Sequence, residues 1–198
     1  VRLNAGGSTF VNPMMTKWAK AYNEKFGVKV DYSATGSGNG IQQMIAKTID
    51  FGCTDAPLNE EQIAKAKGNG GAVLHVPLVM GGLVPAYNLP DVQETIKFTG
   101  PVLADIYLGK IKKWNDPALQ SLNPDVNLPD LEIAVVNRSD SSGSTFIWTD
   151  YLSKVSPEFA QTVGRGTSVK WPTGIGQKGT EGVAGHVVRS PGALGYVE

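Results

Sequence analysis

The sequence predicts an α/β fold, because one local pattern of strand, loop and helix occurs three times. In each case a short apolar strand leads into a loop rich in glycine and hydroxyl side chains, and an amphipathic helix follows. The loops are residues 5–10, 35–40 and 137–146. Ser-Thr-Phe occurs in the first loop, at 8–10, and again in the third, at 144–146. Strands that alternate with helices in this way are typical of sheets flanked by helices.

The amino-acid composition of the chain argues against several classes of function. The 198 residues suffice for one large domain or two small ones, and Lys+Arg equals Asp+Glu at 18 each, so the net charge is zero. That balance argues against nucleic acid or a polybasic membrane contact. The single cysteine, Cys53, excludes an internal disulfide, and the two histidines are isolated in the sequence. We therefore expect no metal and no cofactor.

The individual elements follow from periodicity. Apolar residues at helical spacing predict helices at 14–26, 41–45, 59–67, 103–108, 147–155 and 181–188. Short β-branched or alternating runs predict strands at 1–4, 28–32, 50–53, 131–136 and 191–198. Gly27 and Gly109 end the first and fourth of these helices. Residues 115–130 are rich in Asn, Asp and Pro, so we expect a loop there.

The region from Gly71 to Leu89 is strongly apolar. Its runs at 73–76, 78–80 and 83–84 predict strand structure, and its length and the Gly81-Gly82 pair suggest a strand that crosses from one lobe to another. His75 alternates with apolar residues there, which favours a buried core histidine.

The loop at 137–146 is the candidate anion site. A helix start presents unpaired backbone N–H groups and the positive end of the helix dipole. Arg138 adds a planar fork that matches carboxylate or phosphate oxygens. The alternative is that Ser142 or Ser144 caps the helix and Arg138 pairs with Asp140 on the surface. Three such loops in one chain favour a shared anion site built from helix N-termini.

Asp55 is unusual beside an anion site, because a carboxylate repels the ligand unless the ligand carries a proton to donate. The alternative role for Asp55 is the N-cap of the helix at 59–67. Cys53 is expected to be a small packing residue, since no histidine lies near it in the sequence.

Several motifs together resemble the periplasmic phosphate-binding proteins of ABC-type high-affinity phosphate importers. The similarity is collinear over the whole chain, and the motifs are Ser8–Phe10, Gly36–Gly40, Asp50–Leu58, Ala104–Trp114, Arg138–Gly143 and Pro191–Glu198. The resemblance implies a two-lobed Venus-flytrap fold in which each lobe is a mixed sheet flanked by helices. The first lobe would be residues 1–80 and the second 81–198. Family members usually continue past the final Gly-Tyr-Val-Glu, so we expect the first lobe to be incomplete.

The resemblance also implies where phosphate binds, in the cleft between the lobes. The ligand-contacting residues would be Thr9, Phe10 (through its backbone), Ser37, Asp55, Arg138, Asp140, Ser142, Gly143 and Ser144. Arg138 would bind phosphate while Asp140 holds it, and Asp55 would accept the phosphate proton. The family often has threonine at Ser144 and alanine at Cys53; a hydroxyl donor is kept at the first position.

We therefore expect a non-catalytic, monomeric phosphate receptor that delivers phosphate to ABC permease subunits in the inner membrane. Its location would be periplasmic, or extracellular with a membrane anchor in a Gram-positive source. Asp55 would discriminate against sulfate, which has no proton to donate, by at least about tenfold.

Three alternatives compete with this expectation. The first is a phosphatase or serine hydrolase that uses Ser142, but no Gly-x-Ser-x-Gly is present and neither histidine lies in a nucleophile-elbow context. The second is a receptor for another oxyanion such as sulfate or molybdate, which Asp55 disfavours. The third is a surface-attached phosphate binder with an adhesive role, in which the basic residues of 110–114 contact a partner.

Overall fold

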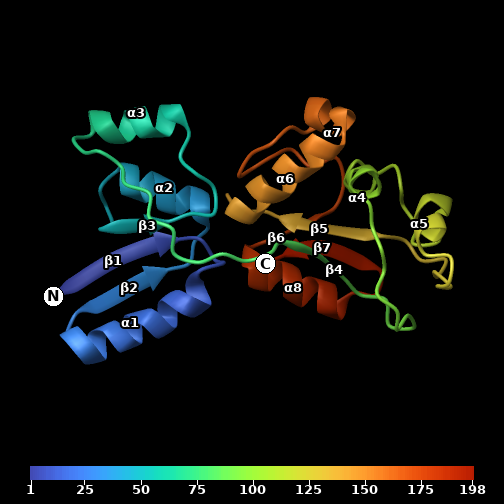
Figure 1. Cartoon of the computed structure of the whole chain (residues 1–198), viewed down its shortest axis with the longest axis horizontal. Coiled ribbons are helices and arrows are strands. Elements are labelled where there is room, and N and C mark those ends of the chain that lie inside the picture. The colour runs from blue at the N-terminus through green and yellow to red at the C-terminus, as the bar shows by residue number, and fades with distance from the viewer.

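A computed structural model describes all 198 residues and shows two sheets, each flanked by helices, which lie side by side along the long axis of the molecule (Figure 1). The first lobe contains β1 (Arg2–Gly7), α1 (Asn12–Phe26), β2 (Lys29–Ser33), α2 (Ser37–Ile45), β3 (Phe51–Cys53) and α3 (Glu60–Gly68). The second contains β4 (Val84–Tyr87), α4 (Gly100–Tyr107), α5 (Pro117–Leu122), β5 (Ala134–Arg138), α6 (Gly143–Val155), α7 (Pro157–Thr162), β6 (Ile175–Gln177), α8 (Gly179–Arg189) and β7 (Ala193–Val197). The expected two-lobed α/β architecture is confirmed.

The first sheet has three parallel strands in the order β2-β1-β3, so the mixed sheet expected in each lobe is found only in the second. Ala5 of the central strand pairs with Tyr32 on one side and with Phe51 on the other. Because the strands are parallel, their carboxyl ends share one edge of the sheet, and that is where ligand sites of α/β folds form. The loops that follow β1, β2 and β3 therefore gather at the edge that faces the second lobe (Figure 1).

The second sheet is mixed, with the order β4-β7-β5-β6 and β4 antiparallel to β7. The main hydrophobic core of the molecule, a cluster of 16 buried residues, lies in this lobe, whereas the largest cluster of the first lobe has three members. In the main core Trp148 stacks on Tyr196 with ring centroids 5.5 Å apart. Trp114 is fully buried and its indole N–H donates to the Gly192 carbonyl at 3.0 Å. The second lobe is thus the better packed of the two.

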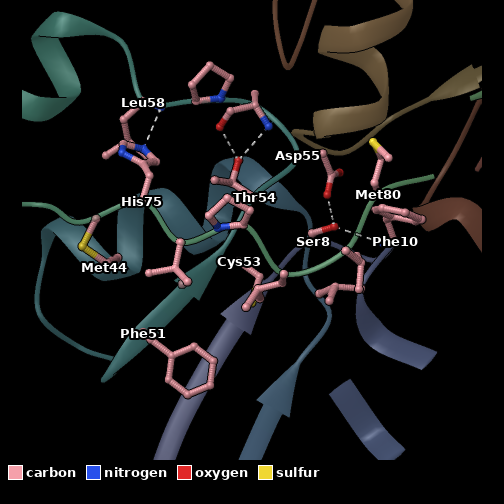
Figure 2. A pocket seen from close by; sticks show the side chains of 18 of the residues that line it. Ser8, Phe10, Met44, Phe51, Cys53, Thr54, Asp55, Leu58, His75 and Met80 are labelled. Carbon is pink, nitrogen blue, oxygen red and sulfur yellow. Dashed lines mark hydrogen bonds between the residues drawn. The ribbon is translucent and has the colours of Figure 1, made fainter. Parts of the chain in front are cut away.

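The apolar segment 71–83 is not a strand, contrary to the prediction from its sequence. It crosses between the lobes without regular secondary structure, and none of its N–H groups donates a backbone hydrogen bond. A strand needs a neighbour to pair with, and no strand lies on the outer side of β3. Leu74 and Met80 are consequently 84% and 100% exposed. His75 is exposed too, so its predicted core position is wrong; its ring accepts from the Leu58 N–H (Figure 2).

The predicted loop at 115–130 contains a short helix, α5. Asp116 caps it by accepting from the Ala118 N–H at 2.9 Å, Pro117 occupies the first turn, and Leu119 is fully buried. The helix exists because its one apolar side enters the core, and a six-residue segment is too short to reveal that by periodicity. The longest helix, α1, has 15 residues, and no helix combines the length and apolar character needed to cross a membrane.

Candidate anion-binding site

The polar loops of the two lobes meet at the carboxyl edges of both sheets (Figure 1). Two hydrogen bonds join the lobes directly there. The Gly38 N–H, in the first turn of α2, donates to the Ser141 carbonyl at 3.1 Å. The hydroxyls of Thr9 and Thr180 lie 3.1 Å apart, and either can donate. The loops singled out by their sequence pattern therefore converge on one place.

Arg138 is the last residue of β5, and its side chain is only 1% exposed. Its Nε and Nη2 donate to the two oxygens of Asp140 at 2.7 and 2.5 Å, in a bidentate pair. The remaining nitrogen, Nη1, points to the hydroxyls of Ser144 and Thr180 at 3.2 and 3.4 Å. The alternative of a surface ion pair is wrong. Asp140 instead holds one edge of a buried guanidinium and leaves the other directed into the site.

Asp140 remains ionised within this arrangement. Burial alone would raise its pKa, but the Arg138 guanidinium and the Gly179 N–H, which donates to its Oδ1 at 3.0 Å, together lower the pKa below the usual value. Gly179 is the first residue of α8, so the positive end of that helix dipole also stabilises the ionised form of Asp140.

Asp55 follows β3 and lies across the lobe boundary from Arg138. It accepts a hydrogen bond from the Ser8 hydroxyl (Figure 2) and another, at 3.2 Å, from the Ser37 hydroxyl. Burial raises the pKa of this carboxyl, the two hydroxyls oppose the rise, and the nearby charge of Glu198 adds to it. Asp55 does not cap α3; Asn59 does, in a reciprocal pair with Gln62. The N-cap alternative for Asp55 is therefore wrong.

Gly143 is a point of close approach between the lobes. A Cβ atom on this residue would lie 2.4 Å from Asp55 Oδ2 and 2.6 Å from the Ser37 hydroxyl oxygen. Only glycine allows the start of α6 to touch the first lobe in this way. The N–H groups of Ser37, Gly143 and Ser144 have no acceptor within the protein, as expected at helix starts. Together they provide three donors beside Asp55 and Arg138.

Three further sequence-predicted site residues also make internal hydrogen bonds. The Ser142 hydroxyl is the N-cap of α6 and accepts from the Thr145 N–H at 3.2 Å. The Phe10 N–H donates to the Ser8 hydroxyl at 3.1 Å, and the Thr9 hydroxyl contacts Thr180. A ligand that used any of these groups would compete with its internal partner.

Sequence reasoning missed three residues of the site. Ser8 holds Asp55, Thr180 lies beside Arg138, and Glu198 accepts from the hydroxyls of Ser144 and Thr180, the latter at 2.6 Å. A signal existed for Thr180, since the glycine-rich turn at 172–180 opens a helix in the same manner as the other three loops. Nothing local distinguishes Glu198, which follows a buried strand.

Comparison with known proteins identifies the family. The model of a domain described as a PBP superfamily domain matches residues 1–198, the whole chain. The chain belongs to the PBP superfamily. Among curated relatives, this PBP-superfamily chain is 53% identical to the phosphate-binding protein PstS of Pasteurella multocida and 49% identical to PstS of Xylella fastidiosa. The alignments cover 99% and 100% of the chain but 56% and 53% of those proteins. The chain thus spans about half the length of the curated relatives it matches.

A solved structure shares this fold across the whole chain. It is that of a substrate-binding protein of a phosphate ABC transporter from Clostridium perfringens with bound phosphate, and its TM-score is 0.69 at 21% identity. The match covers 100% of this chain and 70% of that one. This likeness establishes the PBP fold of the chain.

Proposed function

We propose that this PBP-superfamily chain binds inorganic phosphate between lobes formed by residues 1–80 and 81–198. One observation carries the proposal: a buried guanidinium whose open edge faces hydroxyls lies close to a partly buried carboxylate that can accept a proton from the ligand. Hydrogen phosphate suits both groups, because it has negative oxygens for Arg138 and a proton for Asp55. The names of the PstS relatives support the same ligand.

In this proposal the ligand is held mainly by neutral donors. The open Nη1 of Arg138, the hydroxyl groups and the N–H groups at the helix starts surround the oxygens, while Asp140 offsets the arginine charge. Helix N-termini suit an anion because of their unpaired N–H groups and dipoles. The proposed ligand set is the one expected from the sequence: Thr9, Phe10, Ser37, Asp55, Arg138, Asp140, Ser142, Gly143 and Ser144.

Selectivity follows from Asp55. Phosphate near neutral pH can donate a proton to the carboxylate, whereas sulfate has none to donate and meets a like charge. An unpaired buried polar group costs about 1–3 kcal/mol, and more when it is charged. That range corresponds to discrimination of roughly tenfold to a hundredfold.

We further propose that the chain acts as a receptor without catalysis, and that an ABC permease in the membrane receives the phosphate. The location would be periplasmic or, with an anchor, extracellular, and the receptor would be a monomer. A serine-hydrolase mechanism has little support, because the Ser142 hydroxyl caps a helix and contacts no histidine. His75 bonds the Leu58 N–H, and His186 lies against Gln177.

Calorimetric titration with phosphate and with sulfate tests the proposal on the unaltered chain and on Asp55→Asn. The unaltered chain should bind phosphate and give no measurable sulfate response. In Asp55→Asn the like charge is removed and an amide donor appears, so sulfate affinity should rise at least tenfold while phosphate affinity falls. Equal binding of both anions by the unaltered chain would refute the role of Asp55 and favour a general oxyanion receptor. Binding of neither anion would refute phosphate as the ligand of this chain.

A further inference from the structure

Glu198 lies at the lobe junction, directly after β7, the strand between β4 and β5 (Figure 1). β7 runs parallel to β5, so the residues that follow these two strands emerge at the same edge of the sheet. Arg138 ends β5 at that edge. The topology therefore brings the Glu198 carboxylate into the anion site, although the two residues are 60 positions apart in the sequence.

The contacts of this carboxylate resemble those of an anionic ligand. One of its oxygens accepts from the Ser144 hydroxyl and the other accepts from the Thr180 hydroxyl at 2.6 Å. These are the same two hydroxyls that lie 3.2 and 3.4 Å from Arg138 Nη1. Two carboxylate oxygens thus occupy the two donors beside the open edge of the guanidinium.

Charge makes this contact incompatible with a bound oxyanion. Arg138 is already paired with Asp140, and the first lobe contributes the Asp55 carboxylate to the same site. Glu198 adds a further carboxylate, and its charge helps to raise the pKa of Asp55, so the two groups interact across the site. An oxyanion that accepted hydrogen bonds from Ser144 and Thr180 would use the two hydroxyls that already donate to Glu198. The two negative groups would then compete for the same donors.

We propose that Glu198 is a built-in competitor: its carboxylate holds the Ser144 and Thr180 hydroxyls and must leave them when an oxyanion binds. The inference rests on the proposed function and adds a residue that lowers affinity. In this proposal the Thr180 hydroxyl donates to Glu198 in the free protein and to the oxyanion in the complex.

Substitution of Glu198 by glutamine tests this inference. Glutamine keeps the shape but removes the charge, so Glu198→Gln should bind phosphate more tightly than the unaltered protein. If the carboxylate occupies the hydroxyls nine-tenths of the time, the gain is about tenfold. Glu94→Gln is the matched control, since Glu94 is exposed, forms no ion pair or hydrogen bond, and its replacement changes the net charge equally. Its phosphate affinity should be unchanged.

A second variant identifies the mechanism. Thr180→Val removes one of the two hydroxyls that hold Glu198, so the gain from Glu198→Gln should fall below about threefold in the Thr180→Val background. If Glu198→Gln increased phosphate affinity as much in the Thr180→Val background as in the unaltered protein, the Glu198 charge would act only at long range. That result would refute competition for the hydroxyls. Thermal unfolding of each variant confirms that it is folded.

The outcomes separate this inference from the proposed function. If the unaltered protein binds phosphate and Glu198→Gln binds it equally or more weakly, Glu198 is no competitor and the proposed function stands. If neither protein binds phosphate, the proposed function fails and the inference fails with it.

Discussion

Two partly buried carboxylates of the candidate site have pKa values that their neighbours shift in opposite directions. Asp140 has a guanidinium and a helix N–H as partners, which lower its pKa despite burial. Asp55 has only hydroxyl donors, and burial raises its pKa. Pairs of titratable groups whose environments move their pKa values apart are typical of sites in which one group handles a proton and the other holds a charge. The proposed roles of the two residues follow this division.

The raised pKa of Asp55 predicts a pH-dependent stability. A raised folded-state pKa contributes stability that is fully present below the unfolded value, near 3.8, and is lost as the pH rises through the folded value. At neutral pH the ionised, partly buried Asp55 therefore destabilises the folded protein. Asp55→Asn should raise the melting temperature at pH 7, and the gain should disappear below about pH 4. Differential scanning calorimetry of both proteins from pH 3.5 to 8, without phosphate, measures this difference in melting temperature.

Asp140→Asn is the matched control for that experiment. Its lowered pKa contributes stability that is present above the unfolded value and is lost as the pH falls, so this variant should melt lower than the unaltered protein at pH 7. A stabilising effect of both substitutions at neutral pH would mean that simple charge removal, and not the two environments, determines the result.

At the scale of elements, the start of α6 has two separable tasks. Ser142 caps the helix, and Gly143 lets that helix start lie against the first lobe. Ser142 stabilises the helix, and this agrees with the sequence-based alternative in which Ser142 caps it. The glycine belongs to the contact between lobes, because the atoms that a Cβ would meet belong to Asp55 and Ser37.

Gly143→Ala should hold the lobes apart. The added Cβ would lie 2.4 Å from Asp55 Oδ2, too close for any real contact, so the lobes must separate. We expect a larger radius of gyration by small-angle X-ray scattering and phosphate binding at least tenfold weaker. Gly182→Ala, within α8, is the control: its Cβ would lie 3.6 Å from Gln177 Cβ, an ordinary contact. That variant should gain up to about 1 kcal/mol of stability with the same radius. An unchanged radius in Gly143→Ala would refute the close approach.

At the scale of the whole molecule, the two lobes are unequally built. The second holds a 16-residue core, whereas the first has a three-stranded sheet and an apolar crossing segment that stays exposed. The longer relatives, of which this chain spans about half, have further residues. We propose that residues 1–80 form a partial lobe whose crossing segment becomes covered when such residues are present.

Hydrogen exchange measures this inequality. The N–H groups of 71–83 make no backbone hydrogen bonds, so their exchange should be nearly unprotected within seconds, while the amides of β7 exchange slowly. In a longer form of the protein, 71–83 should gain protection and β7 should change little. Equal protection of 71–83 in both forms would contradict the partial lobe.

Much of the architecture was predictable because it depends on local pattern. Apolar spacing located α1 and α6, glycine ended α1 at Gly27, and the recurring hydroxyl-rich loops indicated the candidate anion site around Arg138. Each of these features is encoded within about 15 neighbouring residues, and helix periodicity and chain reversal act over that range. By itself, then, the sequence determined the α/β class and the chemistry of the central loop, and its resemblance to a known family supplied the two lobes.

Only the tertiary structure decided the rest. The apolar run 71–83 had the composition of a strand, but strand formation requires a partner that lies elsewhere in the chain. Thr180 and Glu198 entered the site because parallel strands bring distant segments to one edge. Whether Arg138 and Asp140 formed a surface pair or a buried one depended on which helices covered them. Pairing and burial are relations between distant residues, so local pattern does not contain them.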